Sequence, residues 1–193
     1  TGTYQNWNTS CAECHSTDLH KNYKAQSRSF DTTFAELNVG CEACHGPGEQ
    51  HLALAKQGTL KGATDGGFPT ALAQRGQWAF PVDAHIAKRT APLQSNAQID
   101  NCGRCHSRRG TLGNYHYGAA LLDTHRLALP QAPLYYPDGQ IRDEVYEYGS
   151  FVQSKMHLAG VVCSNCHEPH SLQLHAPGNG VCAQCHEAAH YDT

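Results

Sequence analysis

The chain has 193 residues and a formal net charge of −3, which excludes the strongly basic footprint of a nucleic-acid-binding domain. No apolar run approaches 18 residues, so the sequence predicts no transmembrane helix. Ten cysteines and fourteen histidines are far more than an ordinary soluble domain carries, and they point to metal or cofactor chemistry. No signal peptide is visible at Thr1-Gly2-Thr3-Tyr4, so we expect a processed chain or a segment of a longer one.

All ten cysteines fall into five pairs, and each pair reads C-x-x-C-H, the attachment sequence of c-type haem. Two thiols about one helical turn apart can reach the two vinyl groups of one porphyrin, and the next histidine can bind the iron as proximal ligand. Zinc ribbons and disulfide frameworks also pair cysteines, but neither requires that histidine. The sequence therefore predicts five covalent haems. The cysteines are Cys11, Cys14, Cys41, Cys44, Cys102, Cys105, Cys163, Cys166, Cys182 and Cys185, and the proximal ligands are His15, His45, His106, His167 and His186.

Haem attachment of this kind belongs outside the cytoplasm, so we expect the periplasm or the exterior of a prokaryotic cell. Each haem carries two ionised propionates, and its core carries +1 when the iron is ferric. Five haems would therefore add a net charge of about −5 when oxidised and about −10 when reduced. An acidic holoprotein would steer toward redox partner proteins with a basic docking surface. We expect no nucleic-acid partner.

One short helix is predicted after the second motif. Residues 49–57 read as a helix that ends at Gly58. On this helix His51 shares a face with Leu54 and Ala55, so its imidazole is expected to point inward to a haem.

The rest of the chain predicts loops and one turn. Residues 58–80 are rich in Gly and Ala and read as loop, and residues 107–150 carry no haem motif. The turn Pro137-Asp138-Gly139 lies between strand-forming residues and predicts a small β-hairpin near residues 134–148.

The five motifs begin at residues 11, 41, 102, 163 and 182, and the last two are so close that their haems are expected to be neighbours. Haem contacts are expected to take the place of a side-chain core. We therefore expect a mainly helical and irregular fold, with short helices and long loops around the haems, in a single pentahaem domain over residues 1–193.

A low-spin haem needs a sixth ligand, usually His or Met, and nine histidines remain for this role. His170 follows proximal His167 by three residues, so it is expected to bind a neighbouring iron rather than its own. The candidate distal ligands are His51, His170, His157, His125 and His20, with Met156 as the alternative to its neighbour His157. His125 is included because its apolar setting favours burial near a haem. A solvent-exposed imidazole is an equal alternative for His20, as it is for His85, His116, His175 and His190.

Three arginines, Arg104, Arg108 and Arg109, cluster around the third motif. They either pair with haem propionates, receive an acidic partner, or form a solvated basic face.

The stretch Val39-Gly40-Cys41-Glu42-Ala43-Cys44-His45-Gly46-Pro47-Gly48 resembles the tetrahaem cytochrome c family of ammonia oxidisers. A longer resemblance is to bacterial multihaem cytochromes that join a haem domain to tetratricopeptide repeats. Residues 4–11, 138–142, 148–151, 160–170 and 176–179 carry it. It implies a haem-rich, mostly helical and irregular fold that acts in extracytoplasmic electron transfer. This chain departs from those relatives in having no tetratricopeptide repeats.

The leading functional hypothesis is electron transfer through five haems, mostly six-coordinate with His ligands, because no other catalytic constellation can be argued. One alternative is a multihaem oxidoreductase with one open-site haem that acts on a small nitrogen or sulfur compound. Another is self-association into a conductive extracellular filament, since haem motifs lie near both ends of the chain. We favour a carrier over an enzyme.

Overall fold

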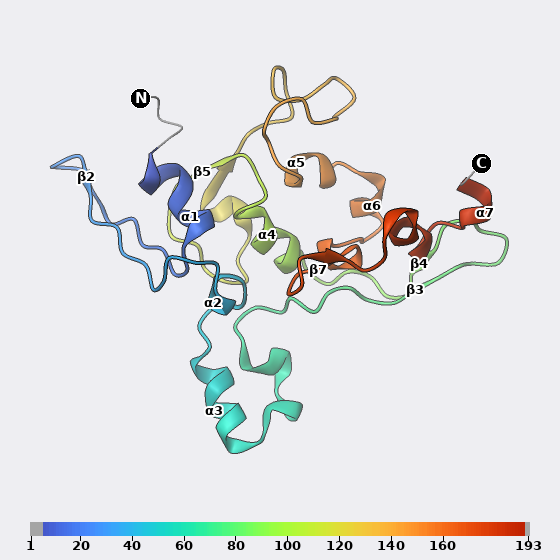
Figure 1. Ribbon diagram of the computed structural model, residues 1–193, viewed down its shortest axis with the longest axis horizontal. Coiled ribbons are helices and arrows are strands. Elements are labelled where there is room, and N and C mark those ends of the chain that lie inside the picture. The colour runs from blue at the N-terminus through green and yellow to red at the C-terminus, as the bar shows by residue number, and fades with distance from the viewer. Residues whose placement is uncertain (1–5, 192–193) are drawn as a thin grey trace.

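Short elements joined by long irregular segments make up the protein (Figure 1). The computed structural model describes residues 6–191, so Tyr4 and Gln5 of the resemblance given above lie outside the described residues. The helices are α1 (Ala12–His15), α2 (Cys41–His45), α3 (Glu49–Gln57), α4 (Ala97–Gly103), α5 (Tyr148–Phe151), α6 (Lys155–Leu158) and α7 (Ala188–Tyr191). Trp7–Cys11 forms a π-helical turn, and 3₁₀ turns span Leu60–Gly62, Thr64–Gly67, Leu121–Asp123, Cys163–Asn165 and Gly178–Gln184. The predicted mainly helical and irregular fold is confirmed.

The strands pair only as small antiparallel ribbons within the described residues. β1 (Tyr23–Lys24) pairs with β2 (Ser29–Phe30), β3 (Trp78–Ala79) with β4 (Lys88–Arg89), β5 (Arg109–Thr111) with β6 (His125–Leu127), and β7 (His167–Glu168) with β8 (Gln173–Leu174). Two-stranded ribbons of this length are marginal by themselves, so their stability must come from what packs on them.

The helix predicted after the second motif is confirmed as α3, which ends where the sequence predicts. Gly58 follows it with φ at +71°, a left-handed conformation that glycine adopts without strain. Glu49 in the first turn and Lys56 in the last turn complement the helix dipole. With the 3₁₀ turns that follow, α3 forms a lobe at the bottom of the molecule (Figure 1).

The β-hairpin predicted near residues 134–148 is present only as a turn closed by one bridge. Tyr135 and Ile141 form an isolated antiparallel bridge around this turn, with Gly139 at φ +86°. The predicted second arm is wrong, because Tyr146 adopts a left-handed φ of +59° that ends any extended pairing, and Tyr148 begins α5.

The loop predicted over residues 58–80 is largely irregular, and Arg89 is one of the residues that anchor it. The guanidinium of Arg89 donates hydrogen bonds to four backbone carbonyls, those of Gln74, Arg75, Ala91 and Gly160, at 2.7, 3.3, 3.0 and 2.8 Å. Because Gly160 lies just before the fourth motif, Arg89 ties this loop to the segment that carries that motif.

A small apolar core surrounds α4. Among the described residues the buried apolar side chains are Ala12, Ala87, Ala97, Ile99, Leu121, Tyr135, Val145 and Val162. Gly103, at the end of α4, packs so closely that a Cβ atom there would lie 2.6 Å from the Tyr148 ring and 2.7 Å from Leu121. Gly103, in the middle of the third motif, is therefore embedded in the core, whereas His106 at the end of the motif is exposed.

The polypeptide exposes 12816 Å² of accessible surface. A compact folded chain of 21.0 kDa would expose only about 9,000 Å². The excess is large, so the chain buries too little of itself to form an ordinary globular domain, as expected where prosthetic groups supply the core.

Replacing Arg89 with Ala should lower the free energy of unfolding by about 2 kcal/mol, because it removes several hydrogen bonds from a charged donor. Chemical denaturation followed by far-ultraviolet circular dichroism measures this loss. The matched control is Lys88→Ala in the same strand, whose side chain is exposed and should change stability by less than about 0.5 kcal/mol. Equal effects of the two substitutions would contradict the anchoring role of Arg89.

Candidate functional site

Turns of helix carry the C-x-x-C-H motifs. In the third motif the backbone N–H groups of Cys105 and His106 both donate to the carbonyl of Cys102, at 3.2 and 2.9 Å. In the fifth motif Cys185 and His186 make the same two bonds to Cys182, at 3.1 and 2.9 Å. Residues three and four positions apart on a helical turn share a face, so in these two motifs the turn sets two thiols and one imidazole on the same side. In the fourth motif the Cys166 N–H donates to the Cys163 carbonyl at 3.2 Å, and His167 begins β7.

The donor set of these motifs suits thioether attachment better than a bare metal ion. All ten thiols are free, whereas a structural zinc site needs four ligands around one point. Within residues 6–191, no group of three or more Cys, His, Asp or Glu side chains is gathered to hold a metal ion. Thiols in separate pairs, each followed by an imidazole, fit a porphyrin that brings four of the iron's ligands itself.

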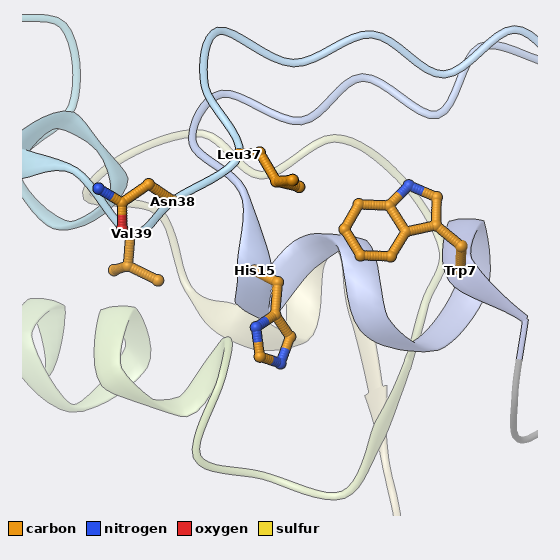
Figure 2. Close-up of a pocket in the computed structure, with 5 residues that line it drawn as sticks. All are labelled: Trp7, His15, Leu37, Asn38 and Val39. Atoms are coloured by element: carbon orange, nitrogen blue, oxygen red, sulfur yellow. The ribbon is translucent and has the colours of Figure 1, made fainter.

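The first motif borders a hollow of about 340 Å³ that is lined by Trp7, His15, Leu37, Asn38 and Val39 (Figure 2). Figure 2 shows the His15 imidazole with the side chains of Trp7, Leu37 and Val39 around the same space. Trp7 comes from the π-helical turn that leads into the motif, and the other two precede the second motif. An apolar wall beside a proximal imidazole is the surface that a porphyrin face needs.

The structure brings His45, the predicted proximal ligand of the second motif, to His170, which follows the fourth motif. Their ring centroids lie 6.0 Å apart and the ring planes are parallel within 5°. Two imidazoles that bind one metal ion from opposite sides, at bond lengths of about 2 Å each, have ring centres about 6 Å apart. Burial, then the nearby His170 and His51, lowers the pKa of His45, which favours the neutral imidazole that a metal requires.

His51 lies near the same site, but Phe68 separates it from His45. The Phe68 ring is 4.4 Å from the His51 ring and 4.8 Å from the His45 ring. The Nδ1 atom of His51 is 2.8 Å from the carbonyl oxygen of Gly66. A proton on Nδ1 donated to that carbonyl leaves Nε2 with a free lone pair, the arrangement typical of a metal-binding histidine.

His157 and Met156 are adjacent on α6 and differ in burial. Met156 is 49% exposed, whereas His157 packs edge-on against Phe151 with ring centroids 5.6 Å apart. In the part of the chain that the structure describes, the buried Nδ1 atom of His157 has no hydrogen-bond partner. A buried polar atom without a partner is costly, which is a reason for it to meet a ligand.

His125 is buried as predicted, but both of its ring nitrogens contact protein side chains. Nε2 lies 2.6 Å from a carboxylate oxygen of Glu13, and Nδ1 lies 2.9 Å from the Thr124 hydroxyl. Burial alone would raise the pKa of Glu13, but the hydrogen bonds from His125 and Thr111 and the charge of Arg109 outweigh it. They hold this pKa at about 2. His125 therefore lies in a buried polar cluster, and iron ligation would require it to leave Glu13.

The motifs contact one another in an order that differs from their order along the chain. The third motif contacts the first, since the Sγ atom of Cys14 lies 4.0 Å from the carbonyl oxygen of Cys105. The helix α4, which leads into it, also contacts the fourth: the Gln98 amide N–H donates to the Ser164 hydroxyl at 2.9 Å, and the Ser164 backbone N–H donates to the Gln98 amide oxygen at 2.9 Å. The fourth motif contacts the fifth, where the Gln184 amide donates to the carbonyl of Asn165 at 3.3 Å.

Arg104 and Arg109 of the arginine cluster are engaged by the protein. Arg104 donates to the carbonyl of Ala43 in the second motif at 2.9 Å, and its guanidinium lies over the rings of Tyr115 and Tyr117, 4.4 and 5.1 Å from the centroids. Arg109 pairs with Glu13. The alternative interpretation of these arginines as a solvated basic face is therefore wrong for Arg104 and Arg109.

The sequence did not predict that His85 and His190 lie together beside the fifth motif. His85 and His190 stack with centroids 3.9 Å apart and planes within 2°. The Ala87 N–H donates to the carbonyl of Cys185 at 2.7 Å, which holds the segment around His85 against the motif. No local signal in the sequence could reveal this, because about 100 residues separate the partners.

The remaining candidate, His20, lies on the surface beside Asp18. The carboxylate of Asp18 is 3.1 Å from its Nε2 atom, and 45% of its side chain is exposed. None of the described contacts brings it to a proximal histidine, so a ligand role for His20 stays a prediction.

Comparison with known proteins supports the haem chemistry for the first part of the chain. Residues 2–46, which include the first two motifs, match a family model described as cytochrome c554 and c-prime. This similarity supports electron transfer by a c-type cytochrome with covalently bound haem. Neither the curated proteins nor the solved structures contain a match to the chain. The longer resemblance to cytochromes with tetratricopeptide repeats stays a prediction. No helix among the described residues is long and apolar enough to cross a membrane.

Replacing His125 with Leu should destabilise the protein by about 2–3 kcal/mol, because the buried Glu13 carboxylate loses a hydrogen-bond donor. It should leave the number of haems and their spin states unchanged. Denaturation and electron paramagnetic resonance (EPR) of the oxidised protein measure the two effects, with the exposed His116→Leu as control. A new high-spin haem in His125→Leu would instead show that His125 is a distal ligand.

Proposed function

We propose that this chain carries five covalently bound c-type haems and passes electrons between redox partners. The observation that carries the proposal is the repetition of one local arrangement. At five places two free thiols stand three positions apart at a helical turn and an imidazole follows directly, although in the fourth motif this histidine, His167, begins β7. The haems would supply one-electron chemistry at their irons, and the chain would set their spacing, ligation and solvation. The family match over residues 2–46 supports this for the first two motifs.

We propose that His170 is the distal ligand of the iron bound by His45. The support is geometric, since the two imidazoles are parallel and 6.0 Å apart. The short turn from His167 to His170 would then hold two haems at once, one through each histidine. Haems joined in this way are close enough for electrons to hop between them.

For the irons of the other motifs, we propose His157 and His51 as distal ligands, on the grounds of burial and of ring tautomer respectively. His157 is a better distal ligand than Met156, because its ring is packed inward and its Nδ1 atom lacks a partner among the described residues. His51 presents Nε2 as a free acceptor. For His125 we propose a hydrogen-bonding role with Glu13 in place of ligation.

The proposed location and partners follow from the same chemistry. Covalent haem attachment favours the periplasm or the cell exterior. Haem propionates make the holoprotein acidic, which favours a redox partner with a basic docking surface.

The test of this function is a count of haems and of their spin states. The mass of the holoprotein should equal the polypeptide plus five haems, and the double variant Cys182→Ala/Cys185→Ala should carry four. The oxidised protein should give only low-spin EPR signals, and carbon monoxide should leave the reduced optical spectrum unchanged. Fewer than five haems would contradict the proposal. A high-spin haem that binds carbon monoxide would favour the oxidoreductase, and filaments in particle images would favour the assembled conduit.

Replacing His170 with Ala should convert one low-spin haem to a high-spin haem that binds carbon monoxide, because one iron loses its sixth ligand. The matched control is His175→Ala, an exposed histidine that should leave all spin states unchanged. An unchanged EPR spectrum for His170→Ala, with a new high-spin signal for His51→Ala, would assign the position opposite His45 to His51 instead.

A further inference from the structure

Glu13 occupies the second variable position of the first motif, which haem attachment leaves free. Its side chain is nevertheless only 8% exposed. A carboxylate that is buried so fully needs several polar partners. One partner of Glu13 is Lys21, and the others come from the ribbon formed by β5 and β6.

That ribbon directly follows the third motif. Arg109 and Thr111 lie on β5, and His125 lies on β6 beside Thr111. Glu13 receives hydrogen bonds from Thr111 and His125, and its carboxylate lies 3.4 Å from the guanidinium of Arg109. Arg109 is only three residues after His106, so the ribbon continues directly from the third motif.

Arg109 also bridges the two motifs directly. Its Nη2 atom donates to the Sγ atom of Cys14 at 3.3 Å, and its Nε atom donates to the carbonyl of Arg104. Cys14 belongs to the first motif and Arg104 to the third. A thioether sulfur is still a weak acceptor, so this contact is compatible with haem attachment at Cys14.

The cysteines of the two motifs face each other across this cluster. The Sγ atom of Cys14 is 4.0 Å from the carbonyl oxygen of Cys105, and the Sγ atom of Cys105 is 3.9 Å from the carbonyl oxygen of Glu13. These sulfurs mark where one edge of each porphyrin would be bonded. The two haem edges would therefore approach each other here.

We propose that Glu13 is a positioning residue that holds the first and third haem-attachment sites together, so that their haems form a directly coupled pair. The proposal rests on the proposed function, since it requires haems at both sites. An electron lost by one iron of the pair is gained by the other, and no proton or further reactant is needed. The route through the protein then runs from the first motif to the third, and α4, which leads into the third motif, also contacts the fourth through Gln98 and Ser164. Electron order would thus differ from chain order.

The experiment compares Glu13→Gln with the wild type in the fully loaded protein, by NMR redox titration that resolves each haem. Glutamine keeps the shape of the side chain but removes the charge between the two haems. The midpoint potentials of the haems bound by His15 and His106 should both shift, while the other three stay within error. The matched control is Glu42→Gln in the second motif, whose carboxylate accepts a hydrogen bond from the N–H of Gly48 at 2.6 Å. It should leave the potentials of the first and third haems unchanged.

A shift confined to the haem of His15, or no shift at all, would overturn the proposal. If Glu13→Gln loads poorly, Thr111→Val keeps the charge and the shape while removing one hydrogen bond, and it should shift the same two potentials by less. The mass of the wild-type holoprotein is measured before any titration. A mass that corresponds to fewer than five haems would contradict the proposed function instead.

Discussion

Every part of this structure depends on the small amount of apolar surface that the polypeptide can bury against itself. Its longest described helix has nine residues, its described strands have two or three, and its accessible surface far exceeds that of a compact chain of equal mass. With few side chains to pack on, an element need only be long enough to hold one haem-binding turn. Attachment by two thioether bonds also removes the need for a deep pocket, because the porphyrin cannot leave. Short turns, isolated ribbons and long connections all follow.

Features that depend on neighbouring residues alone were predictable from the sequence. The five motifs are chemical spacings, and α3 has both a helical pattern and a glycine at its end, so local rules suffice for each. The hairpin near residues 134–148 was predicted by the same local rules and is mostly wrong. Strand propensity cannot foresee a left-handed residue such as Tyr146, whose conformation is set by the surrounding fold rather than by its side chain.

The proximal and distal halves of the predicted site differ in how far neighbouring residues can specify them. Proximal histidines are specified by adjacency to cysteine, whereas a distal histidine is specified by what lies across the haem. The sequence predicts that His170 binds a neighbouring iron, but the stacking of His170 beside His45 is visible only in the structure. Likewise, the apolar neighbours of His125 predicted its burial correctly, but Glu13, its partner, lies 112 residues away. Partners of this kind become visible only when the fold brings them together.

The embedding of Gly103 bears on how this family of sequences could diverge. Haem attachment constrains the two cysteines and the histidine of a motif and leaves the middle positions open to drift. At Gly103 the ring of Tyr148 and the side chain of Leu121 leave no room for a Cβ atom, so substitution of this glycine by a larger residue is excluded unless its neighbours change. Among homologues we therefore expect the middle of the third motif to change slowly, and to change only together with residues 121 and 148. In an alignment of homologous sequences, the third motif would therefore be the fixed position relative to which the other four motifs are placed.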